Sequence, residues 1–484
     1  MTTNIHNGTS RMLWWSAAVA LLIRLLMMGA YPVAETTEAR YAEIARKMLE
    51  LGDWITPWYD YGVPFWAKPP LPTWLSASSM GLLGANEFAA RLPHFLAGLL
   101  VLWLLWDWLR RRSPREAQFA TVLLTGAALF YVSAGAVMTD MTFAVGLLLA
   151  MRGFWQGLHG EPARRKQEGY ALFIGLAIGL LAKGPIALVL AGLPLVGWML
   201  LSRDWRSVWR NLPWPGGTAL MLALTLPWYV AAELKTPGFL DYFLVGEHWQ
   251  RFTVAGWTGD RYGHAHAFPR GSIWPFTLEA CLPWPLLLPL LAFGRTPAAP
   301  APTERAWSRY LWCWALTPAL FFTFAGNILW TYALPALPAI AALAAGWLAR
   351  DSRSWRVERL LACGVLTTAV LLAVAIAWND TRGTWKTAEP VVRAWQARGG
   401  VGEPLLFLGE RPYSAAFYSR GRAELMVGDE ALTRHLAGTG TAYVAMVSEL
   451  ISGLPADLRR TLRDLGTYGR YKLYLYEPQR EERG

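Results

Sequence analysis

Long apolar runs joined by short connections constrain the fold of this chain more than any other feature. Runs of this kind are typical of helices that cross the hydrocarbon core of a bilayer. The sequence therefore predicts an all-α polytopic membrane protein over its first 378 residues. The candidate spans are 12–30, 88–109, 116–134, 139–158, 169–182, 184–201, 214–233, 272–294, 307–325, 327–349 and 357–378.

Basic residues occur in alternate connections, after the second, fourth, sixth, eighth and tenth runs. Because cytoplasmic loops carry the excess of Lys and Arg, this alternation places the N-terminus in the cytoplasm. It places the connections 31–87 and 234–271 and the C-terminal part outside. The net charge of +11 has the same origin, so we expect no nucleic acid partner. Three cysteines all fall inside apolar runs, which predicts neither a disulfide framework nor a metal site: Cys281, Cys313 and Cys363.

The first outer connection contains a segment with helical periodicity from Glu38 to Leu51. Apolar residues share one side of this segment. Glu43 with Lys47, and Arg46 with Glu50, are four residues apart on the other side and are expected to pair. The pattern predicts an amphipathic helix in the membrane interface, capped by Thr36 or Thr37. A second short helix is expected around 237–249.

From residue 379 the composition changes to that of a soluble α/β domain, 379–484. Strands are expected within 403–410, 423–428, 441–448 and 471–478, and helices at 389–398 and 456–465. This part lacks a GxGxxG motif, a P-loop and a catalytic constellation. We expect it to serve as a lid or as a docking module for an acceptor.

Charged residues near the outer ends of the spans are candidates for chemistry, because charges at membrane depth are costly. Glu35 and Glu38 begin the interfacial helix, where they either cap it or orient an acceptor as a general base. Asp140 either caps a helix or faces a site. Three cations could bind a phosphate if they share one cavity, although a lysine at an outer turn can also snorkel to the interface. They are Arg40, Lys68 and Lys183.

Seven segments in a fixed order, spread over residues 12 to 350, resemble the C-type membrane glycosyltransferases. They are TEARYAEIARKM, GDWITPWYDYGVPFWAKPPLPTWL, GANEFAARLPHF, TDMTFAV, AKGPIALV, PWYVAAELKTPGFLDYFLVGEHWQRF and TYALPALPAI. They are most similar to the branch that contains the bacterial 4-amino-4-deoxy-L-arabinose lipid A transferase and the protein mannosyltransferases. The resemblance implies 11 to 13 spans and an inverting sugar transfer from a polyprenyl phosphate, such as undecaprenyl phosphate, at the periplasmic face of the bacterial inner membrane.

The resemblance leaves the acceptor open among lipid A, a protein and another envelope glycan. We expect a monomer. A flippase for lipid-linked sugars is the alternative outside the enzyme class. A flippase would predict repeated span patterns and charges throughout the midplane, whereas the charges here concentrate on the outer side.

By the same resemblance, Arg40, Lys68 and Lys183 would contact the donor phosphate, and Asp140 would face the cavity. Thr37 stands where relatives carry an aspartate, which leaves Glu35, Glu38 and Asp140 as the expected catalytic carboxylates, or an acceptor that is already ionised and needs no strong base. The remaining expected cavity residues are Tyr41, Glu247, His248 and Tyr332.

Relatives hold a divalent metal with a histidine that matches His248 and with a glutamate whose position is Ala67 here. We therefore expect no tightly bound cofactor and at most a weakly held metal at His248. His264 and His266 are expected to be polar loop residues.

Overall fold

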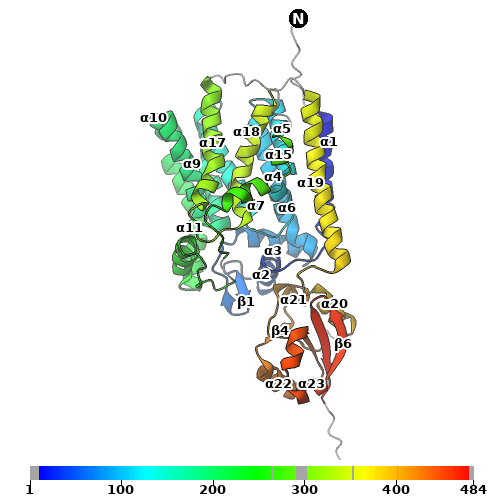
Figure 1. Cartoon of the computed structure of the whole chain (residues 1–484). Helices are drawn as coiled ribbons and strands as arrows, with labels where there is room; N and C mark the ends of the chain where they lie inside the picture. The colour runs from blue at the N-terminus through cyan, green and yellow to red at the C-terminus, as the bar shows by residue number, and fades with distance from the viewer. Residues whose placement is uncertain (1–9, 264–265, 290–301, 351–353, 400–401, 479–484) are drawn as a thin grey trace, which may run out of the picture. The chain divides into compact units, whose positions relative to one another are not determined.

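Helices form at the apolar runs of the sequence (Figure 1). The structure, a computed structural model, describes residues 10–263, 266–289, 302–350, 354–399 and 402–478. It divides into two compact units. The first comprises Met1–Met28, Asp53–Leu75 and Arg91–Val374, and the second comprises Gly29–Gly52, Ser76–Ala90 and Ala375–Gly484.

The first unit is helical, and its helices follow the predicted spans closely. In the part of the chain that the structure describes, five helices are long and apolar enough to cross a membrane by length and composition. The protein is therefore mostly helical with several membrane-spanning segments. Its helices are α1 (Arg11–Met27), α4 (Glu87–Arg110), α5 (Pro114–Gly126), α6 (Ala128–Ser133), α7 (Asp140–His159), α8 (Arg165–Lys183), α9 (Ile186–Ser202), α10 (Trp205–Asn211), α11 (Trp214–Lys235), α12 (Phe239–Asp241), η1 (Tyr242–Gln250), α13 (Arg251–Thr253), α14 (Ile273–Ala280), α15 (Trp284–Leu287), α17 (Pro302–Phe322), η2 (Trp330–Ala336), α18 (Leu337–Leu348) and α19 (Ser354–Arg382), the last of which ends in the second unit.

Glycines bring α7 and α8 into close contact at the centre of the first unit. A Cβ atom at Gly153 would lie 2.3 Å from a backbone nitrogen of α8, and one at Gly175 would lie 2.4 Å from backbone atoms of α7. Small residues allow this approach, as is common between membrane helices. Because α7 begins at Asp140 and α8 ends at Lys183, the packing brings these two residues together.

The predicted span 272–294 is interrupted. Helix α14 ends at Ala280, and the short α15 follows only at Trp284. Pro283 and Pro285 lie at this break, and a proline inside a helix removes a backbone donor and clashes with the preceding turn. Residues 290–294 of this span lie outside the described residues.

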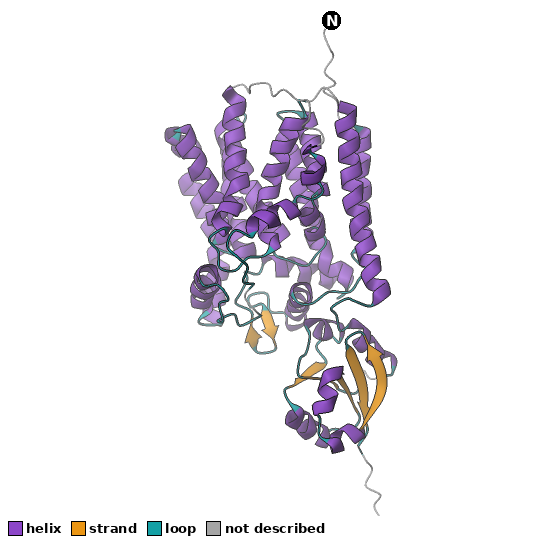
Figure 2. Ribbon diagram, viewed as in Figure 1, coloured by secondary structure: helices purple, strands orange, loops and turns teal. Residues whose placement is uncertain are grey.

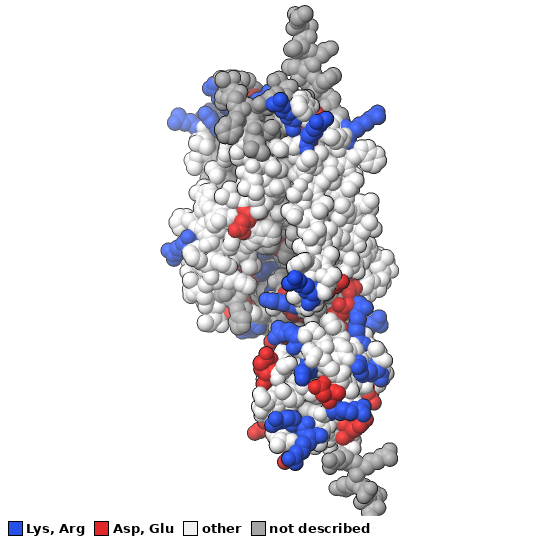
Figure 3. Space-filling model, turned by 45° about the vertical axis from the view of Figure 1, so that its right-hand side comes forward, with Lys and Arg blue, Asp and Glu red and all other residues white. Residues whose placement is uncertain are grey.

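Charge is distributed unevenly over the first unit. Figure 3 shows Lys and Arg side chains grouped at one end of its helices and a largely uncharged band along them. In Figure 1 that end carries α10 and the starts of α17 and α19. A short hairpin of β1 (Trp58–Asp60) and β2 (Val63–Pro64) lies at the opposite end of this unit.

A five-stranded sheet organises the second unit, and Figure 2 shows its strands in orange. The strand order is β4-β3-β5-β7-β6, in which β4, β3 and β5 are parallel and β7 is antiparallel to β5 and β6. Apolar clusters cover both faces of the sheet. The strands are β3 (Leu405–Leu408), β4 (Ala423–Met426), β5 (Ala442–Val447), β6 (Leu462–Tyr468) and β7 (Tyr471–Tyr476), and the helices around them are α20 (Glu389–Ala397), α21 (Tyr413–Tyr418), α22 (Asp429–Ala437) and α23 (Ala456–Thr461).

The four predicted strands are present, but the prediction of a helix over 456–465 is wrong at its end. Helix α23 stops at Thr461, and Leu462 begins strand β6. This segment pairs with β7 along its whole length, with a bulge between Asp464 and Gly466. Tertiary pairing therefore decides the structure of a segment whose local pattern suggests a helix.

The predicted amphipathic helix is α2 (Thr37–Leu51), but its charged side is not a solvated surface. Glu43, Arg46 and Lys47 are only 1%, 5% and 1% exposed. The expected pairs form at 3.4 Å between Glu43 and Lys47 and at 2.9 Å between Arg46 and Glu50, and Arg46 also contacts Glu43 at 2.6 Å. Mutual pairing makes the burial of these charges tolerable. Helix α2 belongs to the same unit as the C-terminal sheet and packs on α21.

Candidate active site

Asp140 and Lys183 form an ion pair inside the first unit. Their Oδ1 and Nζ atoms are 2.7 Å apart, and the side chains are 10% and 13% exposed. The ammonium group also lies 5.1 Å from the centre of the Tyr332 ring. The turn after Lys183 requires a glycine, because Gly184 has φ of +85° and a Cβ there would lie 2.4 Å from Phe243. The cation at the end of α8 is therefore held in place from several sides.

A second ionic cluster forms around the carboxylate of Glu247, whose side chain is 3% exposed. Lys68, from the loop before α3 (Leu71–Leu83), donates to Oε1. Arg251 donates to both carboxylate oxygens at 3.0 Å and also contacts Asp260 at 3.2 Å. Burial would raise the pKa of Glu247, but the charges of Lys68 and Arg251 outweigh it and lower that pKa. Glu247 is thus an ionised carboxylate that forms ion pairs with both Lys68 and Arg251.

Both clusters meet in one cavity with an empty volume of about 660 Å³, which includes space open to solvent. Its wall combines cations, one buried carboxylate and aromatic rings. Five residues expected from the sequence line it: Lys68, Lys183, Glu247, His248 and Tyr332. Asp140 does not line the cavity but pairs with Lys183, which does. The structure thus brings together six predicted residues from five segments of the chain.

Two polar residues of the cavity wall, Arg251 and Asn327, were missed by the sequence reasoning. Arg251 follows Glu247 by four residues, the spacing at which opposite charges pair on a helix. This spacing in the sequence was enough to predict that Arg251 lies beside Glu247. The Asn327 side chain donates to the carbonyl oxygens of Arg251 and Val254 at 2.7 and 2.8 Å and so fixes the segment that carries Arg251. A single asparagine between apolar runs gives no such signal.

An apolar groove runs along the same two helices that wall the cavity, α9 and α17. The cavity is lined by Ile186 and Leu190 of α9 and by Phe322 of α17. The groove, of about 1140 Å³, is lined by residues next to these, such as Leu193 of α9 and Phe321 of α17. The polar cavity and the apolar groove together suit an amphipathic ligand, with its anionic head in the cavity and its hydrocarbon tail in the groove.

His248 is engaged by backbone carbonyls. Its Nδ1 lies 2.7 Å from the Phe243 oxygen, and its Nε2 lies 3.2 Å from the Lys183 oxygen. Burial lowers the pKa of His248, although the contact with Phe243 opposes this. Ala67 supplies no second ligand, and the described residues contain no group of three His, Cys, Asp or Glu side chains that could hold a metal ion. The residues present therefore do not fit the metal site that the resemblance implies.

The other four predicted residues belong to the second unit. The Glu35 carboxylate accepts a hydrogen bond from the Ser414 backbone N–H at 2.6 Å. Burial raises the pKa of Glu35, against the opposing effect of its bonds to Ser414. Glu38 accepts from the Ala34 N–H at 3.3 Å. The Arg40 guanidinium lies 5.5 Å from the ring centre of Tyr41 and 5.9 Å from that of Tyr413.

Of the two loop histidines, His266 is described by the structure and does not line the cavity. His266 accepts a backbone hydrogen bond from Ile328 at 3.1 Å through its carbonyl oxygen. His264 lies outside the described residues.

Comparison with known proteins gives three findings. The model of the dolichyl-phosphate-mannose-protein mannosyltransferase family matches residues 11–243. The undecaprenyl phosphate-α-4-amino-4-deoxy-L-arabinose arabinosyl transferase of Edwardsiella ictaluri is 31% identical over 76% of this chain and 66% of its own length. That of Aeromonas salmonicida is 31% identical over 80% of this chain and 72% of its own length. The matches thus span about two thirds of the relatives' length.

Among solved structures, ArnT from Cupriavidus metallidurans bound to undecaprenyl phosphate superposes with a TM-score of 0.78. The match covers 97% of this chain and 100% of that one at 22% sequence identity. The two proteins share a fold from the helical unit through the C-terminal sheet.

Proposed function

Because the chain belongs to the family of undecaprenyl phosphate-4-amino-4-deoxy-L-arabinose arabinosyl transferases, which are glycosyltransferases, we propose that it transfers a sugar from an undecaprenyl phosphate donor to an acceptor at the periplasmic face of the inner membrane. The observation that carries this proposal is the cavity with three cations, Lys68, Lys183 and Arg251, beside an apolar groove. The sugar is aminoarabinose and the acceptor is a lipid A phosphate.

In this proposal the donor's phosphate binds to the cations and its prenyl chain lies along α9 and α17. Charge-assisted hydrogen bonds from Lys and Arg are the strong ones for phosphate groups. The resemblance adds Arg40 to this set. Glu247 already occupies Lys68 and Arg251, so the incoming phosphate either shares these cations or displaces the carboxylate.

The reaction follows from that placement. An acceptor oxygen attacks the anomeric carbon of the sugar on the face opposite the donor phosphate, and the new carbon–oxygen bond forms as the bond to the donor phosphate breaks. Undecaprenyl phosphate leaves with the electron pair, and the cations stabilise its growing charge. The configuration at the anomeric carbon is inverted. An ionised phosphate acceptor needs no general base.

The proposal gives the carboxylates different roles. Asp140 holds Lys183 in the cavity and faces the substrates. Glu35 and Glu38 accept backbone hydrogen bonds within the second unit, so their roles are to position the start of α2, which carries Arg40 and Tyr41. Tyr332 packs beside the Lys183 ammonium.

The proposed topology has eleven spans, a cytoplasmic N-terminus and a periplasmic C-terminal domain, in a monomer. The grouping of Lys and Arg at one end of the helices supports this orientation, because that end would face the cytoplasm (Figure 3). The β1–β2 hairpin, at the opposite end, would then be periplasmic (Figure 1).

The test is transfer of aminoarabinose from purified undecaprenyl phosphate-aminoarabinose to lipid A, detected by mass spectrometry. Lys68→Ala should reduce the rate by about 100-fold, the usual cost of removing one group that stabilises developing negative charge. Lys235→Ala is the matched control, because Lys235 is an exposed lysine that pairs with Asp53 at 2.7 Å and does not line the cavity.

Wild-type transfer with loss only in Lys68→Ala supports the enzyme. Normal transfer by Lys68→Ala would remove the phosphate role of this lysine. Movement of the lipid-linked sugar across vesicles without any transfer would favour a flippase.

A further inference from the structure

Arg261 presents an exposed guanidinium that lies against two adjacent aromatic rings of the first unit. Its central carbon lies 5.0 Å from the centre of the Trp66 ring and 5.1 Å from that of Tyr242. Within the described part of the chain, no carboxylate lies within ion-pair distance of this guanidinium. An arginine that packs on aromatic rings keeps N–H donors for a bidentate acceptor such as phosphate.

The backbone around Arg261 is fixed by hydrogen bonds. The Arg261 N–H donates to the Tyr242 hydroxyl at 3.2 Å. The hydroxyl of the next residue, Tyr262, accepts from the Trp66 N–H at 3.0 Å and donates to the Pro64 carbonyl at 2.8 Å. The position of the cation is therefore built into the fold rather than left to a mobile surface side chain.

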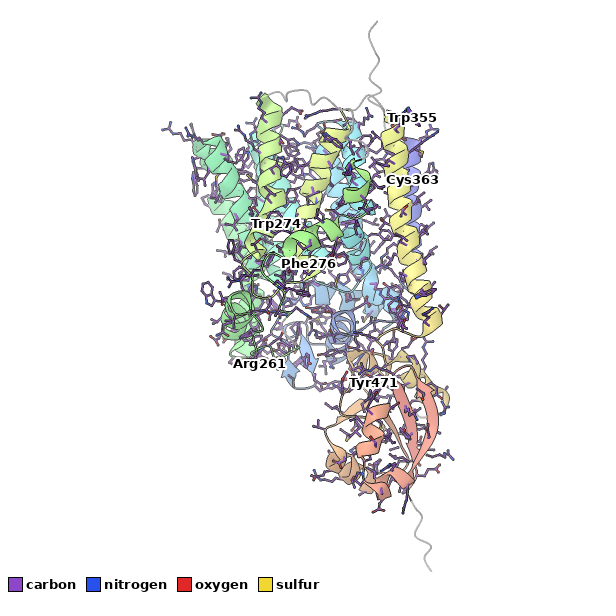
Figure 4. All side chains as sticks on the ribbon, viewed as in Figure 1. Arg261, Trp274, Phe276, Trp355, Cys363 and Tyr471 are labelled. Carbon is purple, nitrogen blue, oxygen red and sulfur yellow. The ribbon has the colours of Figure 1, made fainter. Side chains whose placement is uncertain are left out.

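The same contacts tie Arg261 to the cavity. Asp260, directly before it, pairs with Arg251 of the cavity wall at 3.2 Å. Trp66, under its guanidinium, precedes Lys68 of the wall by two residues, a separation of at most about 7 Å between Cα atoms. Figure 4 shows Arg261 at the end of the helical unit away from Trp355. Arg261 does not line the cavity itself, so it lies beside the donor site and not within it.

We propose that Arg261 binds the phosphate monoester of a phosphorylated glycolipid acceptor and so helps to select an acceptor that carries phosphate. This inference rests on the proposed function and concerns only the second substrate. An oxygen of the acceptor phosphate attacks the anomeric carbon, the bond from that carbon to the donor phosphate breaks, and undecaprenyl phosphate takes the electron pair. The acceptor becomes a phosphodiester, one negative charge passes to the leaving phosphate, and no proton is transferred.

The guanidinium has a clear task in this step. Two phosphates must approach one carbon atom, and their like charges repel. The cations of the cavity compensate the donor phosphate, whereas Arg261 compensates the acceptor. A neutral hydroxyl acceptor would gain nothing from this residue.

The test compares Arg261→Gln with Arg270→Gln, a matched control from the same connection whose side chain is exposed and has no ring contact in the described part of the chain. Initial rates are measured against lipid A at saturating donor, and binding of undecaprenyl phosphate is measured separately. We expect Arg261→Gln to raise the acceptor KM about tenfold while the donor Kd stays within about twofold. Arg261→Lys should recover part of the loss, and Arg270→Gln should behave as wild type.

A second measurement uses the wild-type protein and does not depend on the folding of a variant. Phenylglyoxal modifies accessible arginines, and peptide mapping reports the extent at Arg261. Lipid A should protect this residue, and enzymatically dephosphorylated lipid A should not.

Three results would overturn the inference: an unchanged acceptor KM in Arg261→Gln, a rise in donor Kd in its place, or equal protection by both lipids. Wild-type protein that neither binds undecaprenyl phosphate nor transfers sugar would instead remove the proposed function.

Discussion

Glu247→Gln tests the role of the carboxylate that occupies two cations of the cavity. The Glu247 side chain is 3% exposed, and those of Lys68 and Arg251 are 21% and 18% exposed. Breaking a buried ion pair costs about 3–5 kcal/mol. Arg251 keeps Asp260, and glutamine still accepts one hydrogen bond, so we expect a loss of about 2 kcal/mol in the free energy of unfolding.

The same substitution should strengthen the binding of undecaprenyl phosphate. Its phosphate would meet Lys68 and Arg251 without the competing charge of Glu247, and we expect about tenfold tighter binding, or about 1.4 kcal/mol. Thermal unfolding in detergent with and without undecaprenyl phosphate measures both effects. The ligand should raise the midpoint more in the variant than in wild type, because stabilisation grows with the logarithm of ligand over Kd.

The pH dependence supplies a further check on Glu247. Its folded-state pKa lies below the usual value of 4.5, so its contribution to stability is fully present above pH 4.5 and is lost as the pH falls through the lowered pKa. The stability difference between wild type and variant should therefore shrink in acid. A variant that binds the ligand more weakly, or one as stable as wild type at pH 7, would refute the reasoning.

Two further substitutions test other parts of the structure. The pKa of Glu35 is raised above 4.5 in the folded state, so wild type should lose stability as the pH rises from 4.5 through that raised pKa. Glu35→Gln should remove this loss, and unfolding curves across that range would contradict the argument if the two proteins declined in parallel. Gly184→Ala should lower stability by about 2 kcal/mol, since its φ is +85° and the new Cβ would overlap Phe243. In Gly192→Ala, inside helix α9, a Cβ meets nothing within 4 Å and alanine favours the helix, so stability should not fall, and equal midpoints for the two glycine variants would count against the argument.

Apolar runs and turn residues were sufficient to locate the spanning helices and four strands, because these depend on local composition and period. The burial of Glu43 and Arg46 could not be predicted from the sequence, because the spacing of charged and apolar residues along α2 is the same whether its charged side faces water or other protein segments. Strand β6 was missed because its pairing with β7 is a tertiary contact. The ordered motifs identified Lys68 and Lys183 as candidate site residues. Arg251, which also lines the cavity, could be identified only from its spacing of four residues from Glu247.

The packing of α2 on α21 sets an order of events during biosynthesis. Residues up to Leu51 leave the ribosome long before Tyr413 does, and at about 5–20 residues per second the delay is tens of seconds. Throughout that interval α2 lacks its contact with α21. The first outer connection, which contains α2, is thus translated early but completes its packing late. A chain that stops short of Tyr413 would leave the α21-binding side of α2 exposed to quality-control proteases.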